Sequence, residues 1–186
     1  LGTIANIETV AQRLAIHKPA YVVLDPVTRA SSGDALATED LAAALIDHLA
    51  PLTTLVTPNL AEAAKLAQDQ VPTSIEQMSA IAAKLHRAGF SAVLVKGGHL
   101  AGAESVDLLC DADAERVFTA PRVATKNTHG TGCTLSAAIA ASLANDLPLA
   151  AAIEAAKAYV SASLAGADSL SVGHGAGPLH HFRDLW

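Results

Sequence analysis

Apolar runs that suit β-strands alternate with helical stretches along this chain, and that alternation limits the folds it can adopt. Three such runs, at residues 21–24, 54–56 and 92–96, each end in polar residues. Two more strand-like pieces follow at 105–110 and 116–119. Strands separated by helices pair in parallel, and a parallel sheet needs helices on both of its faces. The sequence therefore predicts an α/β fold with a central, mostly parallel sheet flanked by helices on both faces.

The length and the helix ends fit this fold. A chain of 186 residues suits one domain, so we expect residues 1–186 to form a single domain. Asn6 is the predicted N-cap of a first helix, and Asn59 and Glu62 have the spacing of a capping box. Pro148 introduces a final long helix that runs to about residue 165.

Composition excludes several classes of partner. The net charge of −6 argues against a nucleic-acid-binding protein, because phosphate backbones are bound by clustered Lys and Arg. Hydrophobic residues make up 51% of the chain, yet no apolar run reaches the roughly 18 residues that span a bilayer. Cys110 and Cys133 are too few for a disulfide framework or a cysteine-based zinc site. We therefore expect a cytoplasmic protein that binds neither nucleic acid nor membrane.

The run 127–134 carries the strongest chemical signal in the chain. Gly130 and Gly132 are one residue apart, just ahead of an alanine-rich helical run at 135–145. Glycines allow a tight turn, and a helix start presents unpaired N–H groups that bind anions such as phosphate. Cys133 at this position is either a small packed apolar residue or a thiol that loses its proton readily. We interpret this turn as an anion site in an enzyme that handles phosphate.

Three charged residues follow the predicted parallel strands. Asp25 follows the first strand and Glu62 lies beyond the second, where carboxylates suit Mg²⁺ together with waters and substrate phosphates. Asp25 equally fits a turn before Pro26, and the capping box alone accounts for Glu62. Lys96 ends the third strand before two glycines and either reaches a bound phosphate or is a solvated strand end. Because open α/β sheets bind ligands at the carboxyl ends of their strands, these positions favour a ligand site.

Several other catalytic patterns are missing from the sequence. There is no G-x-x-x-x-G-K-[ST] segment, which excludes a P-loop NTPase, and no G-x-S-x-G elbow, which weakens the case for a hydrolase. Four histidines lie late in the chain, at 129, 174, 180 and 181, without the close pairing of a zinc site. We interpret His180 and His181 as structural or surface residues.

Taken together, these segments resemble a known family. The chain resembles the hydroxymethylpyrimidine/phosphomethylpyrimidine kinases of thiamine biosynthesis, within the ribokinase-like superfamily. The cysteine of G-T-G-C is a specific point of resemblance, since ribokinase-like sugar and nucleoside kinases usually carry Asp there, and the H-G-x-G-P tail is another. The matching segments occur in the family's order across essentially the whole chain, at 23–27, 57–63, 95–99, 126–135 and 172–178.

The resemblance implies phosphoryl transfer from MgATP to 4-amino-5-hydroxymethyl-2-methylpyrimidine and then to its monophosphate, which gives the diphosphate. ATP and Mg²⁺ are the implied cofactors, and the pyrimidine is the implied small-molecule substrate. The resemblance also implies the site residues: Asp25 and Glu62 near Mg²⁺ and the triphosphate, Lys96 on the ATP phosphates, Gly130 and Gly132 as anion-hole glycines, Cys133 as the residue that activates the acceptor hydroxyl, and Asn59, Thr128 and Thr131 in the nucleotide site.

Two departures from the family pattern bear on the substrate. Thr28-Arg29-Ala30-Ser31 stands where the family usually continues with Met and then Ala-Lys-Ser-Gly, and Arg29 is expected to compensate for the missing Lys. The family also opens with a Gly-rich segment that helps to bind the pyrimidine and that would precede Leu1. We therefore expect the natural protein to be longer.

Two alternatives to this function stay open. The first is a pyridoxal kinase of the same superfamily, because pyridoxal carries a similar hydroxymethyl group. The second, from a different class, is a non-catalytic nucleotide- or pyrimidine-binding module. The intact set of Asp25, Glu62, Lys96 and residues 130–133 argues against the second. A homodimer is the family expectation.

Overall fold

The computed structural model describes residues 2–27 and 39–185. The chain divides into two compact units, which are unit 1 (Leu1–Ala101 and Val106–Phe118) and unit 2 (Gly102–Ser105 and Thr119–Trp186). The departure at Thr28-Arg29-Ala30-Ser31 lies outside the described residues. The expected single domain stays a prediction.

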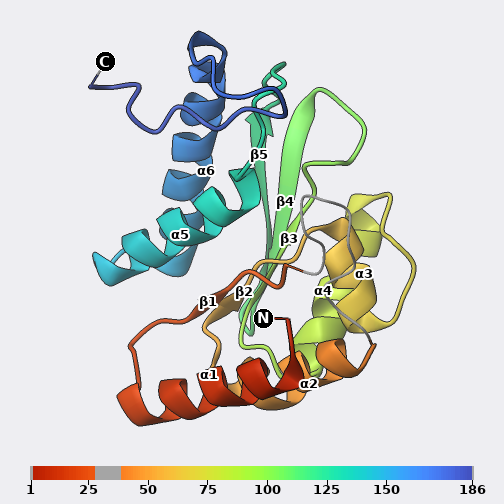
Figure 1. The fold of residues 1–186 in the computed structure, drawn as a ribbon. Coiled ribbons are helices and arrows are strands. Elements are labelled where there is room, and N and C mark those ends of the chain that lie inside the picture. The colour runs from red at the N-terminus through yellow and green to blue at the C-terminus, as the bar shows by residue number, and fades with distance from the viewer. Residues whose placement is uncertain (1, 28–38, 186) are drawn as a thin grey trace. The chain divides into compact units, whose positions relative to one another are not determined.

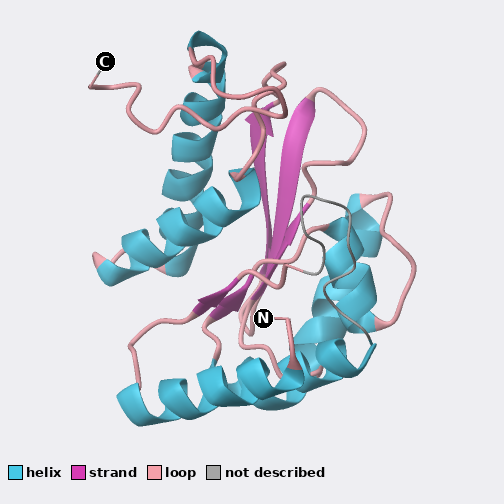
Figure 2. Ribbon diagram, in the orientation of Figure 1, coloured by secondary structure: helices cyan, strands magenta, loops and turns pink. Residues whose placement is uncertain are grey.

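In the described part of the chain, five strands form one mixed sheet in the order β1-β2-β3-β4-β5. The strands are drawn in magenta in Figure 2. β1 pairs with β2 and β2 with β3 in parallel, whereas β3 and β4 are antiparallel. The first two strands are shorter than predicted, because the carbonyl of Val22 accepts the N–H groups of both Thr54 and Leu55 and the regular ladder begins only after it. The strands are β1 (Val23–Leu24), β2 (Leu55–Val56), β3 (Val93–Lys96), β4 (Glu104–Cys110) and β5 (Glu115–Pro121).

Unit 1 contains the first four helices (Figure 1), which are α1 (Ile4–His17), α2 (Glu39–Leu49), α3 (Leu60–Ala67) and α4 (Ile75–Arg87). The N-cap prediction for α1 was wrong. The helix begins after Thr3, whose hydroxyl accepts the N–H of Asn6 at 3.2 Å, so Asn6 occupies the third helical position. α4 is capped by Ser74 and ends just before Gly89, whose φ of +120° suits a residue without a Cβ.

The core of unit 1 packs one face of the sheet against these helices. Val56, Val93, Val95 and Leu108 belong to one buried cluster with Leu49, Met78, Leu85 and Phe90. Burying a side chain of this size contributes about 1.5–3 kcal/mol. Successive strand residues point to opposite faces, and Leu55, Leu94 and Leu109 on the other face are also buried. The strands therefore have the apolar character on both faces that the sequence predicted.

Unit 2 is built on two helices packed side by side, α5 (Thr131–Ala144) and α6 (Leu149–Ala165). α6 begins after Pro148, as predicted, and a 3₁₀ turn (Ala167–Ser169) follows it. Ile139 and Leu143 of α5 and Ile153 of α6 are buried. Among the described residues, none of the helices combines the length and apolar character needed to cross a membrane.

Candidate functional site

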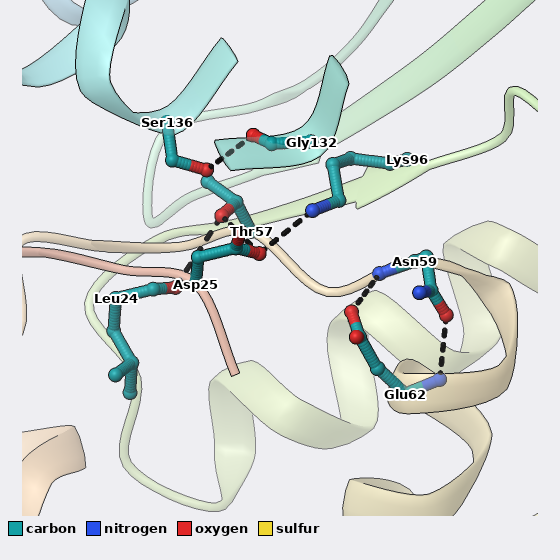
Figure 3. Close-up of polar contacts among 8 residues, drawn as sticks. All are labelled: Leu24, Asp25, Thr57, Asn59, Glu62, Lys96, Gly132 and Ser136. Atoms are coloured by element: carbon teal, nitrogen blue, oxygen red, sulfur yellow. Dashed lines mark hydrogen bonds and ion pairs between the residues drawn. The ribbon is translucent and has the colours of Figure 1, made fainter. Parts of the chain in front are cut away.

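An ion pair joins the ends of two parallel strands in unit 1. The Nζ of Lys96 donates to Oδ1 of Asp25 at 2.7 Å, and the two side chains are only 12% and 16% exposed (Figure 3). The backbone N–H of Lys96 donates to the carbonyl of Pro58 at 2.8 Å, and Lys96 forms an isolated parallel bridge with Asn59. Asp25, Asn59 and Lys96, which the sequence predicted as separate site residues, therefore lie together at the carboxyl ends of β1, β2 and β3.

Thr57 supports this ion pair and was not among the residues predicted from the sequence. Its N–H donates to the carbonyl of Leu24 at 2.9 Å, and its hydroxyl lies 3.5 Å from Oδ1 of Asp25. Thr57 is fully buried. The sequence signal for Thr57 was its place as the first polar residue after a buried strand, two positions before the predicted Asn59. Its bond to the Leu24 carbonyl holds the backbone directly before Asp25 in place.

The predicted capping box of Asn59 and Glu62 is confirmed at the start of α3. Asn59 N–H donates to Oε2 of Glu62 at 2.8 Å, and Glu62 N–H donates to Oδ1 of Asn59 at 2.9 Å (Figure 3). The Glu62 side chain is buried at 6% exposure. Within the described residues, no group of three or more His, Cys, Asp or Glu side chains is arranged to hold a metal ion. A metal role for Glu62 and Asp25 therefore stays a prediction.

The turn after Lys96 is held by a buried carboxylate that the sequence did not reveal. Gly97 N–H donates to Oδ1 of Asp107 at 3.1 Å, and Asp107 is only 5% exposed. A Cβ on Gly97 would collide with the carbonyl oxygen of Val106. Asp107 pairs with Lys96 across the antiparallel β3–β4 ladder, so only a correct strand register would have predicted it. Lys96 is thus held between two backbone partners, Asn59 on one side and Asp107 on the other.

In unit 2, the predicted anion turn is the N-terminus of α5 itself. Gly130 is the N-cap, with a φ of +85° that favours glycine. The helix begins at Thr131, earlier than the predicted helical run, so Gly132 and Cys133 lie in its first turn. Thr131 Oγ1 donates to the carbonyl of Thr128 at 2.7 Å, and no side chain caps this helix end. The first-turn N–H groups and the helix dipole together suit an anion.

The two cysteines have opposite environments. Cys133 is exposed, whereas Cys110 is buried in β4, and these two cysteines form no disulfide. Burial raises the pKa of the Cys110 thiol above its ordinary value, and the nearby carboxylates of Glu115 and Asp111 raise it further. The interpretation of Cys133 as a small packed apolar residue is therefore wrong. Its easy deprotonation stays a prediction.

The two C-terminal histidines have structural surroundings, as the sequence predicted. His180 is buried, and its backbone N–H donates to the carbonyl of Ser163 at 3.0 Å. His181 stacks on Tyr159, with the phenol oxygen 3.0 Å from Nδ1.

Comparison with known proteins places these residues in a family context. The family model for phosphomethylpyrimidine kinase matches residues 1–180. The chain is 52% identical over 164 residues, 88% of its length, to the hydroxymethylpyrimidine/phosphomethylpyrimidine kinase of Rhizobium meliloti. It is 46% identical over 180 residues, 97% of its length, to the corresponding protein of Escherichia coli. The chain spans 62% and 68% of the lengths of these two relatives.

A solved structure also resembles the chain. The pyridoxal kinase from Staphylococcus aureus, in complex with AMP-PCP and pyridoxal, matches with a TM-score of 0.89 and 30% identity over 100% of this chain and 66% of that one. The predicted α/β fold of the ribokinase-like type is thereby confirmed. With the family model matching nearly its whole length, the chain belongs to the phosphomethylpyrimidine kinase family.

Proposed function

We propose that this protein is an ATP-dependent kinase that phosphorylates 4-amino-5-hydroxymethyl-2-methylpyrimidine and then its monophosphate to the diphosphate. The observation that carries the proposal is the family match over residues 1–180, which covers both compact units. Each unit contributes one element suited to phosphate. In unit 1 this is the paired Lys96, and in unit 2 it is the Gly130-capped start of α5.

ATP is the proposed phosphoryl donor, supported by the kinase names of the relatives and by the AMP-PCP bound to the Staphylococcus aureus structure. Lys96 is the proposed contact to the ATP phosphates, since an ammonium in hydrogen-bond range of an oxyanion forms a strong charge-assisted bond. Asn59, Thr128 and Thr131 are proposed as further nucleotide-site residues. Asp25 already pairs with Lys96, so a phosphate that recruits the ammonium also releases the carboxylate.

Mg²⁺ is the proposed metal cofactor, and the residues present fit it. Asp25 and Glu62 supply the one or two carboxylates that Mg²⁺ takes beside phosphates and water. When bound, the ion neutralises charge on the triphosphate. Asp25 and Glu62 would hold the ion, and Lys96 would share the remaining charge on the phosphates.

Gly130, Gly132 and Cys133 are proposed to act on the group in transfer. Backbone N–H groups at the start of α5 would stabilise negative charge on the transferring phosphoryl. The Cys133 side chain, as its thiolate, would accept the proton of the acceptor hydroxyl and become the thiol. A thiolate is a weak base for an alcohol, so deprotonation is late and electrostatic stabilisation supplies most of the rate acceleration.

A kinetic comparison of substrates tests the proposal. The protein is incubated with MgATP and, in parallel, the hydroxymethylpyrimidine, its monophosphate and pyridoxal, while ADP release and product mass are followed. We expect turnover of both pyrimidines with a higher kcat/KM than for pyridoxal, and none with a mock preparation from cells without the protein, which reports contaminating kinases. Preference for pyridoxal would support the second candidate, which the pyridoxal-bound Staphylococcus aureus relative favours. Binding of ATP without any turnover would indicate the non-catalytic module. The homodimer and the cytoplasmic location stay predictions.

A further inference from the structure

The Gly-rich tail of unit 2 is exposed up to residue 176 and becomes buried at Gly177. Residues 171–176 are exposed, whereas Gly177 is buried and Leu179 is almost fully so. At that point the tail lies beside the loop that leads into α5, since His129 bridges to Pro178 in parallel and its N–H donates to the carbonyl of Gly177 at 3.1 Å. The tail is therefore attached to the segment directly before Gly130.

The attachment depends on a close contact between Gly177 and Asn127. A Cβ on Gly177 would overlap Oδ1 of Asn127 and lie 2.7 Å from its Cγ, closer than non-bonded carbons approach. Gly175, in the same tail, would meet nothing within 4 Å. The requirement for glycine at 177 thus comes from the Asn127 carboxamide and not from the tail's own conformation.

The orientation of that carboxamide is set by hydrogen bonds on its other side. Nδ2 of Asn127 donates to the carbonyl of Ala167 at 2.8 Å and lies 3.4 Å from Oδ1 of Asp168. The same Asp168 oxygen accepts the hydroxyl of Thr125, whose Oγ1 accepts the N–H of Asn127 at 3.1 Å. Both partners of Nδ2 are acceptors, so this position requires a donor.

We propose that Asn127 is a positioning residue that locks the tail at Gly177 to the loop before α5 and thereby fixes the anion turn. Two residues separate Asn127 from Gly130, whose left-handed backbone starts the helix. Residues 127–129 are held between the 3₁₀ turn and the tail. These contacts restrict the backbone conformation that Gly130 can adopt at the start of α5. The catalytic consequence rests on the proposed kinase function, whereas the structural consequence does not.

Hydrogen exchange tests the lock without any need for kinase activity. Asn127→Asp replaces the donor by a third acceptor facing Ala167 and Asp168, and Gly177→Ala introduces the overlapping Cβ. In either variant we expect the amides of His129 and Thr134 to exchange at least about tenfold faster, while those in the middle of α6 keep their rates. Gly175→Ala is the matched control and should leave all of these rates unchanged. Equal rates at 129 and 134 in Gly177→Ala and Gly175→Ala would overturn the proposal.

A double variant separates the lock from a general loss of stability. Asn127→Ala leaves a Cβ that is 3.4 Å from the Cβ position of Gly177, an ordinary contact. Adding Gly177→Ala to Asn127→Ala should therefore raise exchange at residue 129 by less than about twofold, far below the effect of Gly177→Ala alone. Additive effects would show that Gly177 clashes with something other than Asn127 and would overturn the proposal. If Gly177→Ala fails to fold, folding of this double variant still supports it.

Kinetics then connect the lock with the turn. We expect Asn127→Asp to lower kcat by about tenfold or more and to change the KM for ATP by less than about twofold, because the anion turn acts on the transferring group. A loss shared equally by kcat and KM, or none, would contradict the link to catalysis. A wild-type protein with no kinase activity but the expected exchange pattern would refute the proposed function and leave the lock intact.

Discussion

The ammonium of Lys96 donates to the carboxylate of Asp25 at 2.7 Å, although the two residues are 71 positions apart in the sequence. The side chains are mostly buried, so the pair is less screened than a surface ion pair. In the absence of phosphate, each group compensates the charge of the other. An incoming triphosphate would exchange one oxyanion partner of Lys96 for another without leaving the ammonium unpaired.

Replacing Lys96 tests this exchange. In Lys96→Ala we expect the KM for ATP to rise by about tenfold or more, because a charge-assisted bond to phosphate is lost. Lys84→Ala is the matched control, since Lys84 pairs with Asp69 at 3.0 Å on the exposed surface. Steady-state kinetics with varied ATP measure both, with thermal unfolding to show that each variant is folded. Similar KM values in the two variants would remove Lys96 from the nucleotide site.

Replacing Cys133 separates turnover from ATP affinity. Cys133→Ala and Cys133→Ser should lower kcat by about tenfold to a hundredfold, with little change in the Kd for ATP, if the Cys133 thiolate accepts the proton of the substrate hydroxyl. Ala137→Ser, an exposed change one turn further along α5, should leave both quantities as they are. Rapid-quench kinetics measure the turnover rate, and equilibrium binding measures the Kd for ATP. A fully active Cys133→Ala protein would exclude the thiol as the base.

The two thiols should differ in their rates of alkylation. With iodoacetamide near pH 8, we expect Cys133 to react at least about tenfold faster than Cys110, because the thiolate is the reactive form and Cys110 is buried. The raised pKa of Cys110 acts in the same direction, since it lowers the thiolate fraction at any pH below that pKa. Peptide mass spectrometry after timed quenching measures both sites in one sample. Equal rates in the folded protein would contradict the structure at β4 or at α5.

Two adjacent glycines after Lys96 should respond differently to alanine. Gly97→Ala places a Cβ against the Val106 carbonyl and 3.0 Å from Cε of Met78, whereas a Cβ on Gly98 would meet nothing within 4 Å. We expect Gly97→Ala to lower the free energy of unfolding by about 2 kcal/mol or more and Gly98→Ala to change it by less than about 0.5 kcal/mol. Urea unfolding followed by circular dichroism compares the pair. Equal midpoints would show that the β3–β4 backbones do not approach this closely.

Features that depend on neighbours in the sequence were the ones that could be predicted. The Asn59–Glu62 capping box and Pro148 before α6 are both local, and the structure contains each of them. The error at Asn6 was also local, since Thr3 offers a hydroxyl three residues earlier and both residue types cap helices. Local chemistry thus limits the choice of cap to a few residues without deciding among them.

Features that depend on strand register could not be predicted. The contact of Asp107 with Gly97 follows from which residues face each other across β3 and β4, and a shift of one position would turn Asp107 to the opposite face. The close approach of Gly177 to Asn127 likewise depends on where a long irregular tail returns. Sequence reasoning named both glycine-rich segments but could not say which of their glycines is essential.

The capping box at α3 makes the proposed metal ligand a part of the helix. Oε2 of Glu62 accepts the Asn59 N–H at 2.8 Å, so a cation held by this carboxylate would bind the same group that caps the helix. If Glu62 holds the ion as proposed, the local unfolding equilibrium of α3 would depend on the magnesium concentration. The first turn of this helix would then act as a sensor of cofactor loading, with the Asn59 amide as its reporter.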